Sequence, residues 1–374
     1  MKVLTVRNGV ILVVVLAAAA AAFYAMRPEP AHAADLGGDC CADLEQRVAT
    51  LEANTPRKGT NRVSLTISGV VDESILSGSD SFGTGSHTYI LANPNDGPEI
   101  DINADAKLTK DWHVGSTLEI LIDQQTPGTT GTGTLSTRQT YVYVKNDMVA
   151  VKLGAVNEAS KGLEEDGVVD LTAVAPMLDI SSLVAWGGVT FPGELFGGTT
   201  EDGIKVEITP LKGLTLAGSY GNEVVNGDAI KDFAARYSAE PVKNIIVNAG
   251  VGYHIDDMTG DKVLKANLGV EEAISGIFAQ MGYGRDQLLG VSGWEVQGGL
   301  DKALLPFGKT DVYAEYGALT GVPGTSGPKL YGVGIQQNFD AADALVYAGY
   351  RHYDSTDAKS DTVDLLQAGL KVKF

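Results

Sequence analysis

The chain has 374 residues, with 28 basic and 47 acidic side chains, a formal net charge of -19, and 44% hydrophobic residues. That apolar content excludes an intrinsically disordered chain, and the acidic balance argues against a nucleic-acid binder, because phosphate binding needs clustered Lys and Arg. Only the N-terminus has an apolar run that approaches a membrane span, which excludes a bundle of membrane helices. Two adjacent cysteines are too few for a disulfide scaffold. A large soluble domain or an outer-membrane β-barrel remains.

Residues 1–33 have the three parts of a secretory signal peptide. Lys2 and Arg7 form a positive n-region, residues 10–22 are uninterrupted apolar, and residues 31–33 (Ala-His-Ala) match the small-x-small cleavage pattern. A retained anchor helix is the alternative, but the apolar run is short for a span of about 20 residues, and two prolines follow it. We therefore expect export through the inner membrane and cleavage at the end of that triplet.

Residues 34–61 combine a short heptad pattern with a linker. Apolar side chains recur at the a and d spacing of a coiled-coil seam, at Cys41, Leu44, Val48 and Leu51. About two heptads are too short to be stable alone unless the chains are already held together. An ordinary amphipathic helix that docks elsewhere therefore stays an equally good interpretation. Pro56 ends the pattern, and residues 57–61 are typical of a flexible linker.

From Arg62 onward the period of the apolar pattern is two, as in half-exposed β-strands. Residues 99–109 are the cleanest case, with Ile100 and Ile102 alternating with Asp101 and Asn103. No long helical pattern interrupts the strands, so a parallel α/β fold is disfavoured. The pattern predicts sixteen strands, at residues 62–74, 99–109, 112–123, 137–146, 149–156, 203–209, 214–221, 232–241, 245–255, 262–272, 275–285, 293–303, 310–319, 329–339, 344–354 and 364–374.

The connections alternate between short and long. Joins after even strands are short, as at residues 110–111, whereas joins after odd strands are mostly long and polar, as at 75–98, 124–136 and 157–202. A transmembrane barrel has this alternation, because its periplasmic turns are short and its outer loops are long. We therefore predict an all-β fold: a 16-stranded antiparallel transmembrane β-barrel over 62–374, with a short N-terminal periplasmic coiled-coil helix. Its outer face would contact membrane lipids.

Phe374 closes the last alternating strand and resembles the assembly signal of bacterial outer-membrane barrels, which implies recognition by the barrel-assembly machinery. The stretch 35–52 (DLGGDCCADLEQRVATLE), the triplet 57–59 (RKG) and the strand 63–69 resemble the opening of general porins of the alphaproteobacterial type. The resemblance implies a homotrimer of water-filled barrels in the outer membrane that pass small hydrophilic solutes and ions. It also implies that the loop after the fifth strand folds into the lumen and narrows it.

That loop is 157–202, the longest connection. It is acidic, with one basic residue, Lys161, and an apolar middle that should pack. An outer surface lid is the alternative. We predict a pore constriction formed by loop acids, with a charged wall opposite. The loop set is Glu158, Glu164, Glu165, Asp166, Asp170 and Asp179. The wall set is Asp101, Asp105, Lys107, Arg138 and Lys152, and Lys205, Arg236 and Lys265 also fall on inward positions.

Tyr220, Tyr253, Tyr283, Tyr313 and Tyr347 fit aromatic girdles at the membrane interfaces. No catalytic pattern emerges, because the five histidines are dispersed and none forms an H-E-x-x-H pair. We therefore expect no enzyme, no cofactor and no metal site. Passive diffusion, filtered by size and charge, is the predicted function. A substrate-selective channel, and a structural tether that grips peptidoglycan through residues 35–55, are the alternatives.

Overall fold

The computed structural model describes most of the chain after residue 62. The described residues are 63–80, 86–123, 134–178, 196, 198, 200–222, 229–257, 259–321, 327–354 and 362–374. The predicted signal peptide, the seam residues Cys41, Leu44, Val48 and Leu51, and the loop acid Asp179 lie outside this set. Among the described residues, no helix is long and apolar enough to cross a membrane.

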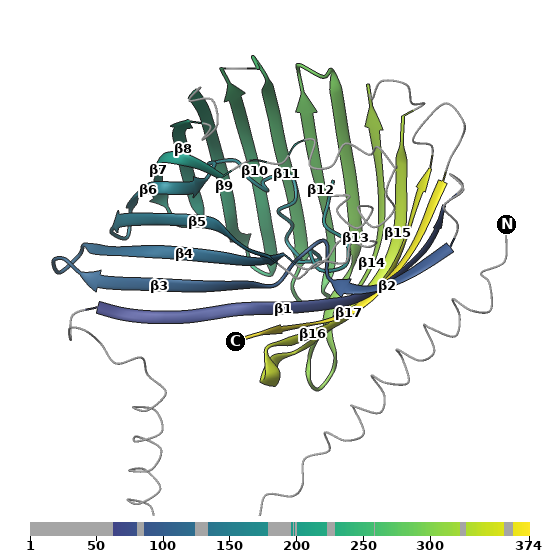
Figure 1. Ribbon diagram of the computed structural model, residues 1–374. Helices are drawn as coiled ribbons and strands as arrows, with labels where there is room; N and C mark the ends of the chain where they lie inside the picture. The colour runs from purple at the N-terminus through teal and green to yellow at the C-terminus, as the bar shows by residue number, and fades with distance from the viewer. Residues whose placement is uncertain are drawn as a thin grey trace, which may run out of the picture.

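In the described part of the chain, seventeen strands form one antiparallel sheet that closes on itself (Figure 1). β2 and β3 pair end to end with the same edge of β1, so the seventeen strands occupy sixteen positions around the barrel, which confirms the predicted 16-stranded fold. The strands are β1 Val63–Asp80, β2 Ser86–Ala92, β3 Glu99–Lys107, β4 His113–Asp123, β5 Thr134–Lys145, β6 Val149–Asn157, β7 Thr200–Leu211, β8 Leu214–Asn222, β9 Ala229–Val242, β10 Ile245–Asp256, β11 Lys262–Glu272, β12 Ile277–Asp286, β13 Val291–Leu305, β14 Gly308–Thr320, β15 Lys329–Phe339, β16 Ala344–Asp354 and β17 Thr362–Lys373, with a 3-10 turn at Asp340–Ala342.

The prediction of a long loop at residues 75–98 is wrong. β1 continues to Asp80 and β2 returns along it, because Leu76 is fully buried against Tyr353, Val363 and Leu365 of the neighbouring strands. The Ser and Gly residues give this stretch a composition that is typical of a loop. They are compatible with a strand here because the backbone ladder to β17 on one side and β2 on the other stabilises it, and this ladder does not depend on side-chain type.

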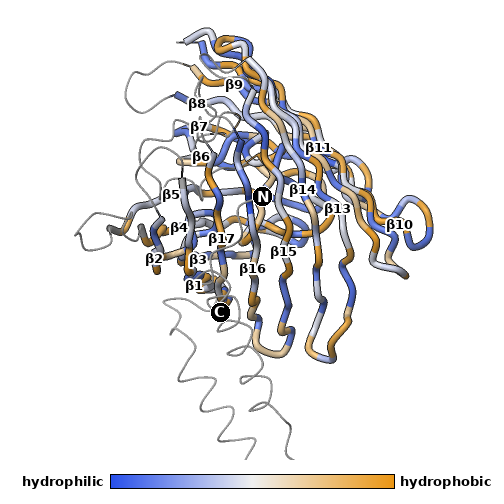
Figure 2. Tube along the Cα trace, turned by 90° about the vertical axis from the view of Figure 1, so that its right-hand side faces the viewer, coloured by the Kyte–Doolittle hydropathy of each residue, from blue (hydrophilic) through white to orange (hydrophobic). Residues whose placement is uncertain are grey.

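The two faces of the barrel wall differ in polarity. Leu65, Phe233 and Val333 belong to the apolar residues that alternate along the strands and remain exposed on the outside, whereas Asp72 and Glu315 belong to the polar residues that are covered on the inside. The alternation is visible as interleaved orange and blue along the strands in Figure 2. An apolar outside and a polar inside are what a barrel in a lipid bilayer requires.

Two of the predicted girdle tyrosines are misassigned. Tyr313 is 3% exposed and Tyr347 is 1% exposed, and both belong to the apolar cluster beneath the segment that follows β6. The Tyr347 hydroxyl donates a hydrogen bond to Asp72 at 2.6 Å. Both tyrosines lie at inward positions, because they alternate with exposed residues such as Val312, so they fill the interior instead of meeting the membrane interface.

The ends of the chain close the barrel. β1 pairs with β17 over eleven residue pairs, from Val70–Lys373 to Asp80–Val363. Beyond this ladder, Gly69 and Phe374 exchange two backbone hydrogen bonds, of 2.9 and 3.0 Å. The Phe374 ring lies over Gly69, where a Cβ would be 2.7 Å from the ring, and the ring remains 62% exposed on the outer face. The terminal aromatic residue therefore covers the seam where the first and last strands meet.

We expect Phe374→Asp to reduce the amount of barrel assembled in cells by several-fold. The substitution places a charge on the lipid-facing side of the closing seam and removes the ring over Gly69. Heat-modifiable migration on gels of outer-membrane fractions measures the assembled form. Phe374→Tyr, which keeps the ring, is the control. Normal assembly of Phe374→Asp would show that the terminal side chain is dispensable.

Candidate pore constriction

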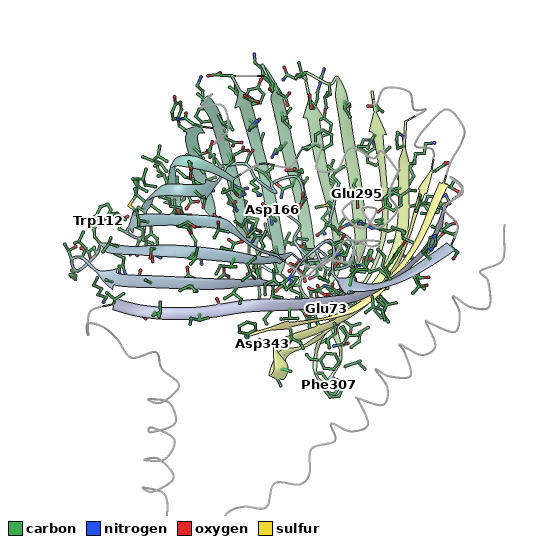
Figure 3. All side chains as sticks on the ribbon, in the orientation of Figure 1. Glu73, Trp112, Asp166, Glu295, Phe307 and Asp343 are labelled. Atoms are coloured by element: carbon green, nitrogen blue, oxygen red, sulfur yellow. The ribbon has the colours of Figure 1, made fainter. Side chains whose placement is uncertain are left out.

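The connection from β6 to β7 lies inside the barrel. Its described part, residues 158–178 with Phe196 and Gly198, is called the inner loop below. Its partners are inward-facing side chains of strands that span more than half of the barrel, from Ser219 on β8 to Arg351 on β16. Asp166 of the inner loop and Glu295 of the wall are labelled in Figure 3.

The backbone of the inner loop is held by amide side chains of the wall. The Gln280 side chain bonds to both the N–H and the C=O of Val169, at 3.0 and 3.1 Å. Five other side-chain amides donate to loop carbonyls: Asn248 to Gly167 at 2.8 Å, Asn267 to Asp166 at 2.6 Å, Gln297 to Ala175 at 2.6 Å, Gln336 to Asp170 at 2.7 Å and Asn93 to Ala173 at 2.7 Å. Because the loop has no ladder of its own, these bonds satisfy polar groups that would otherwise be buried alone.

Inward glycines let the loop approach the wall closely. A Cβ on Gly282 would lie 2.1 Å from the backbone oxygen of Glu164, and one on Gly284 would lie 2.1 Å from the ring of Phe196. Both positions are on β12, where any other residue would displace the loop. Apolar side chains complete the contact, since Leu163, Val174 and Met177 are each about 1% exposed or less. The loop therefore packs on the wall as part of the core.

A buried charge group fixes the far part of the loop. The Arg351 guanidinium donates to both carboxylate oxygens of Glu315, at 2.8 and 3.0 Å, and also to the carbonyl of Pro176 at 2.9 Å. Glu295 accepts a hydrogen bond from the N–H of Leu178 at 2.8 Å. Bidentate arginine pairs are geometrically strict, so this group sets where residues 176–178 lie.

The acids predicted for the constriction divide into two groups. Glu158 and Glu164 are each 1% exposed and point into the wall, whereas Glu165 and Asp166 are half-buried and Asp170 is exposed. Glu164 faces Lys265 at 3.8 Å, and Asp166 pairs with Arg236 at 3.1 Å. Only the second group can present charge to the lumen.

The predicted wall residues lie on a different arc of the barrel and pair with other side chains of that arc. Arg138 bonds to Glu99 at 2.7 Å and also contacts Glu119, and Lys152 pairs with Glu207 at 2.9 Å. Asp105 accepts a hydrogen bond from Tyr143 and lies 2.8 Å from His113. Asp101 and Lys107 belong to the same strand, β3, with Lys107 exposed at its end.

Among the described residues, the basic side chains that pair with the loop acids are Arg236 on β9, His254 on β10 and Lys265 on β11, whereas Arg138 and Lys152 pair with wall carboxylates. The sequence had placed Arg236 and Lys265 on inward positions, but alternation cannot show which strands lie beneath the loop. The wall amides gave no separate signal, because Asn and Gln are ordinary on any polar strand face. These Asn and Gln residues share one feature, which is that they occupy inward-facing positions of the alternating strands.

A polar cavity of about 400 Å³ lies beside the loop. It is lined by loop residues 168–170 and by wall residues that include Glu271, Asp311, Lys309 and Lys371. The lining carries both acidic and basic side chains, which are compatible with water and small ions. The cavity is therefore a polar space next to the inner loop.

Burial raises the pKa of Glu164 to about 7, although the charge of Lys265 acts in the opposite direction. Asp170 behaves differently. Its surroundings desolvate it, which would raise the pKa, but hydrogen bonds from Thr172 and the charges of Lys371 and Lys373 lower the pKa overall. At neutral pH, Asp170 is therefore ionised while Glu164 is near its midpoint.

A family model described as Gram-negative porin matches residues 14–369. The chain belongs to the Gram-negative porin family. No curated relative matches the sequence. The fold is similar to solved porin structures: the anion-selective porin of Comamonas acidovorans (TM-score 0.60, 10% identity, 83% of this chain and 100% of that chain) and a triple mutant of the Rhodopseudomonas blastica porin (TM-score 0.56, 16% identity, 83% and 100%). A loop-deletion mutant of OmpT from Vibrio cholerae is also similar (TM-score 0.55, 12% identity, 84% and 100%).

The protein is thus an outer-membrane porin channel, as its sequence predicted. At such low identities the solved structures establish the fold alone. The paired charges and wall amides described above belong to this porin, and its selectivity has to be argued from them.

Docking of the inner loop in this porin should weaken as pH rises. The pKa of Glu164 is higher in the docked loop than its ordinary value of 4.5, so the docked state holds the proton more tightly. The stabilisation is complete below about pH 4.5 and is lost as pH rises through about 7. It amounts to on the order of 3 kcal/mol.

We expect single-channel current noise to increase between pH 5 and pH 8, and Glu164→Gln to abolish this dependence. Glu165→Gln, one residue away and half-buried, is the control that should keep it. Equal pH dependence in both variants would mean that another group governs loop docking.

Proposed function

We propose that this porin passes small hydrophilic solutes and ions by passive diffusion and filters them by size and charge at the inner loop. The observation that carries the proposal is the position of the loop: its backbone is bonded to wall side chains on several strands inside the barrel. A segment fixed there reduces the open cross-section and places its exposed groups beside the passage. Charge that biases ions without binding them tightly allows solutes to leave as well as to enter.

The charge arrangement supports a modest preference for cations. Glu165, Asp166 and Asp170 are the acids of the described inner loop with accessible side chains, and Asp166 pairs with Arg236. The bases on the other arc, Arg138 and Lys152, are already paired with wall carboxylates. In a narrow passage the distances are below the Debye length of about 8 Å, so salt does not remove this bias.

Replacing the three accessible acids together, as Glu165→Gln, Asp166→Asn and Asp170→Asn, should shift the zero-current potential in a KCl gradient toward chloride. We expect the cation-to-anion permeability ratio to fall roughly two- to fivefold, which corresponds to about 0.4–1 kcal/mol of electrostatic free energy. Planar-bilayer recordings of the purified porin measure it.

The control variant combines Asp111→Asn and Asp147→Asn, two acids in short turns between strands, and should leave the potential unchanged. An unaltered potential in the triple variant, at normal conductance, would remove the inner loop from the selectivity filter. Saturable block of the wild-type current by one solute at low concentration would instead indicate a substrate-selective channel.

We also propose that the porin is a homotrimer exported with a cleaved signal peptide, with residues 34–61 on the periplasmic side. The heptad Cys41, Leu44, Val48 and Leu51 supports it, and an OmpT structure similar in fold is described as a trimer form (TM-score 0.54, 13% identity). The apolar outer face would meet lipid, Phe374 would be read by the barrel-assembly machinery, and residues 35–55 are candidates for contact with peptidoglycan.

In such a trimer three Cys41 side chains approach one another at a seam position. Under oxidising conditions we expect disulfide-linked subunits on denaturing gels, and monomers in the double variant Cys40→Ser/Cys41→Ser. N-terminal sequencing should give Ala34 as the first residue. If the wild-type sample stays monomeric after oxidation, either the disulfide bond forms within one chain or the helix docks away from the trimer axis.

A further inference from the structure

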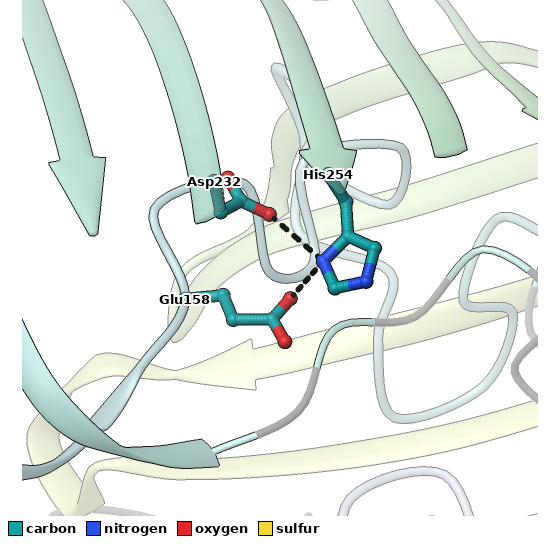
Figure 4. Close-up of side chains that lie close together, drawn as sticks. All are labelled: Glu158, Asp232 and His254. Carbon is teal, nitrogen blue, oxygen red and sulfur yellow. Dashed lines mark ion pairs between the residues drawn. The ribbon is translucent and has the colours of Figure 1, made fainter. Parts of the chain in front are cut away.

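Three side chains of the kind that bind metal ions converge where the inner loop leaves β6. Glu158 begins the loop, Asp232 lies on β9 and His254 on β10 (Figure 4). The Nδ1 atom of His254 lies 3.1 Å from Oε2 of Glu158 and 3.5 Å from Oδ2 of Asp232. Both carboxylate side chains are fully buried, and the imidazole is 14% exposed. In Figure 4 the same ring nitrogen faces both carboxylates.

These separations suit ligands of one ion. Zinc-type ions bind nitrogen and oxygen at about 2.0–2.2 Å, which puts neighbouring ligand atoms of a tetrahedral or octahedral site about 3.0–3.5 Å apart. The three ligand atoms of Glu158, Asp232 and His254 all lie within 4.8 Å of one another. An ion can therefore reach all three with only small side-chain movements.

A fourth carboxylate adds an independent observation. Glu201, at the start of β7, is 1% exposed, and neither of its oxygens has a hydrogen-bond partner that meets ordinary geometry among the described residues, although Ser219 lies beside it. Its carboxyl group lies over Gly221 of β8, 2.8 Å from where a Cβ would be, and it is near enough to Glu158, Asp232 and His254 to interact with them electrostatically. A buried carboxylate without such a bond requires a cation or a proton.

The cations described around this cluster have other carboxylates. Lys205 pairs with Glu207 and donates to the carbonyl of Glu158, and Arg236 pairs with Asp166 and donates to the carbonyls of Ala159 and Lys161. Lys265 faces Glu164. Three buried carboxylates, those of Glu158, Glu201 and Asp232, thus lie around the single imidazole of His254, and a dication there would offset their negative charge.

We propose that Glu158, Asp232 and His254 form a binding site for one divalent transition-metal ion of the Zn²⁺ or Mn²⁺ type, and that Glu201 moves in from beside them as a further ligand. One imidazole with carboxylates favours these ions over Mg²⁺, which prefers oxygen ligands and its own waters. Glu158 begins the inner loop and Glu201 follows its return, so the ion joins both ends of the loop to β9 and β10. The site fixes the base of the constriction and takes no part in solute passage.

Metal binding by the purified, folded porin tests this proposal. After removal of metals with a chelator, equilibrium dialysis against MnCl₂ or ZnCl₂ should give one bound ion per chain. His254→Gln should weaken binding at least tenfold, and so should Glu201→Gln, which keeps the shape of the side chain. Bound Co²⁺ should show the visible absorption of a mixed nitrogen–oxygen site and lose it in both variants.

His113→Gln is the matched control, since His113 also lies 2.8 Å from a carboxylate, that of Asp105, but without a second one. It should bind the ion like the wild type. If His254→Gln does not fold, Glu201→Gln carries the test. No stoichiometric binding by the wild type, or equal binding by Glu201→Gln and the wild type, would overturn the site and leave His254 as an imidazolium between two carboxylates.

Discussion

The interior of this porin depends on one requirement: the inner loop must satisfy its backbone polar groups without a ladder of its own. A long irregular segment inside a barrel is stable only if the wall supplies donors and acceptors. Gln280 shows the solution, because its amide bonds to the N–H and the C=O of the same loop residue, Val169. The neighbouring wall amides donate to further loop carbonyls, and these bonds hold the loop against the wall.

That requirement also determines how charge is distributed. Where the loop lies closest to the wall, at the β12 glycines, its acids are turned inward, and Glu164 shares a buried site with Lys265. At Asp170 the backbone carbonyl is bonded to Gln336, but the side chain is exposed and is held by Thr172. Within the described inner loop, the acids with accessible side chains are therefore those between residues 165 and 170.

The two arcs of the wall have different tasks. The arc from β8 to β16 anchors the loop, because many of its inward polar side chains bind the loop. In the arc from β3 to β6, by contrast, the charged side chains pair across neighbouring strands, as Arg138 does with Glu99 and Glu119. Residues of equal chemical type thus differ in role according to which arc they occupy.

The sequence alone determined the barrel, its sixteen positions and the long connection after β6, because period-two alternation and loop length are local properties that burial on one face imposes. It misjudged residues 75–98, since polar Ser and Gly residues stand in a strand that backbone pairing with β17 stabilises. It misplaced Tyr313 and Tyr347, because alternation reveals that a residue points inward only once the register of its strand is known. Which acids face water, and which bases meet them, was decided by tertiary structure alone: Glu158 and His254 are distant in sequence, and only closure of the barrel around the loop brings them to 3.1 Å.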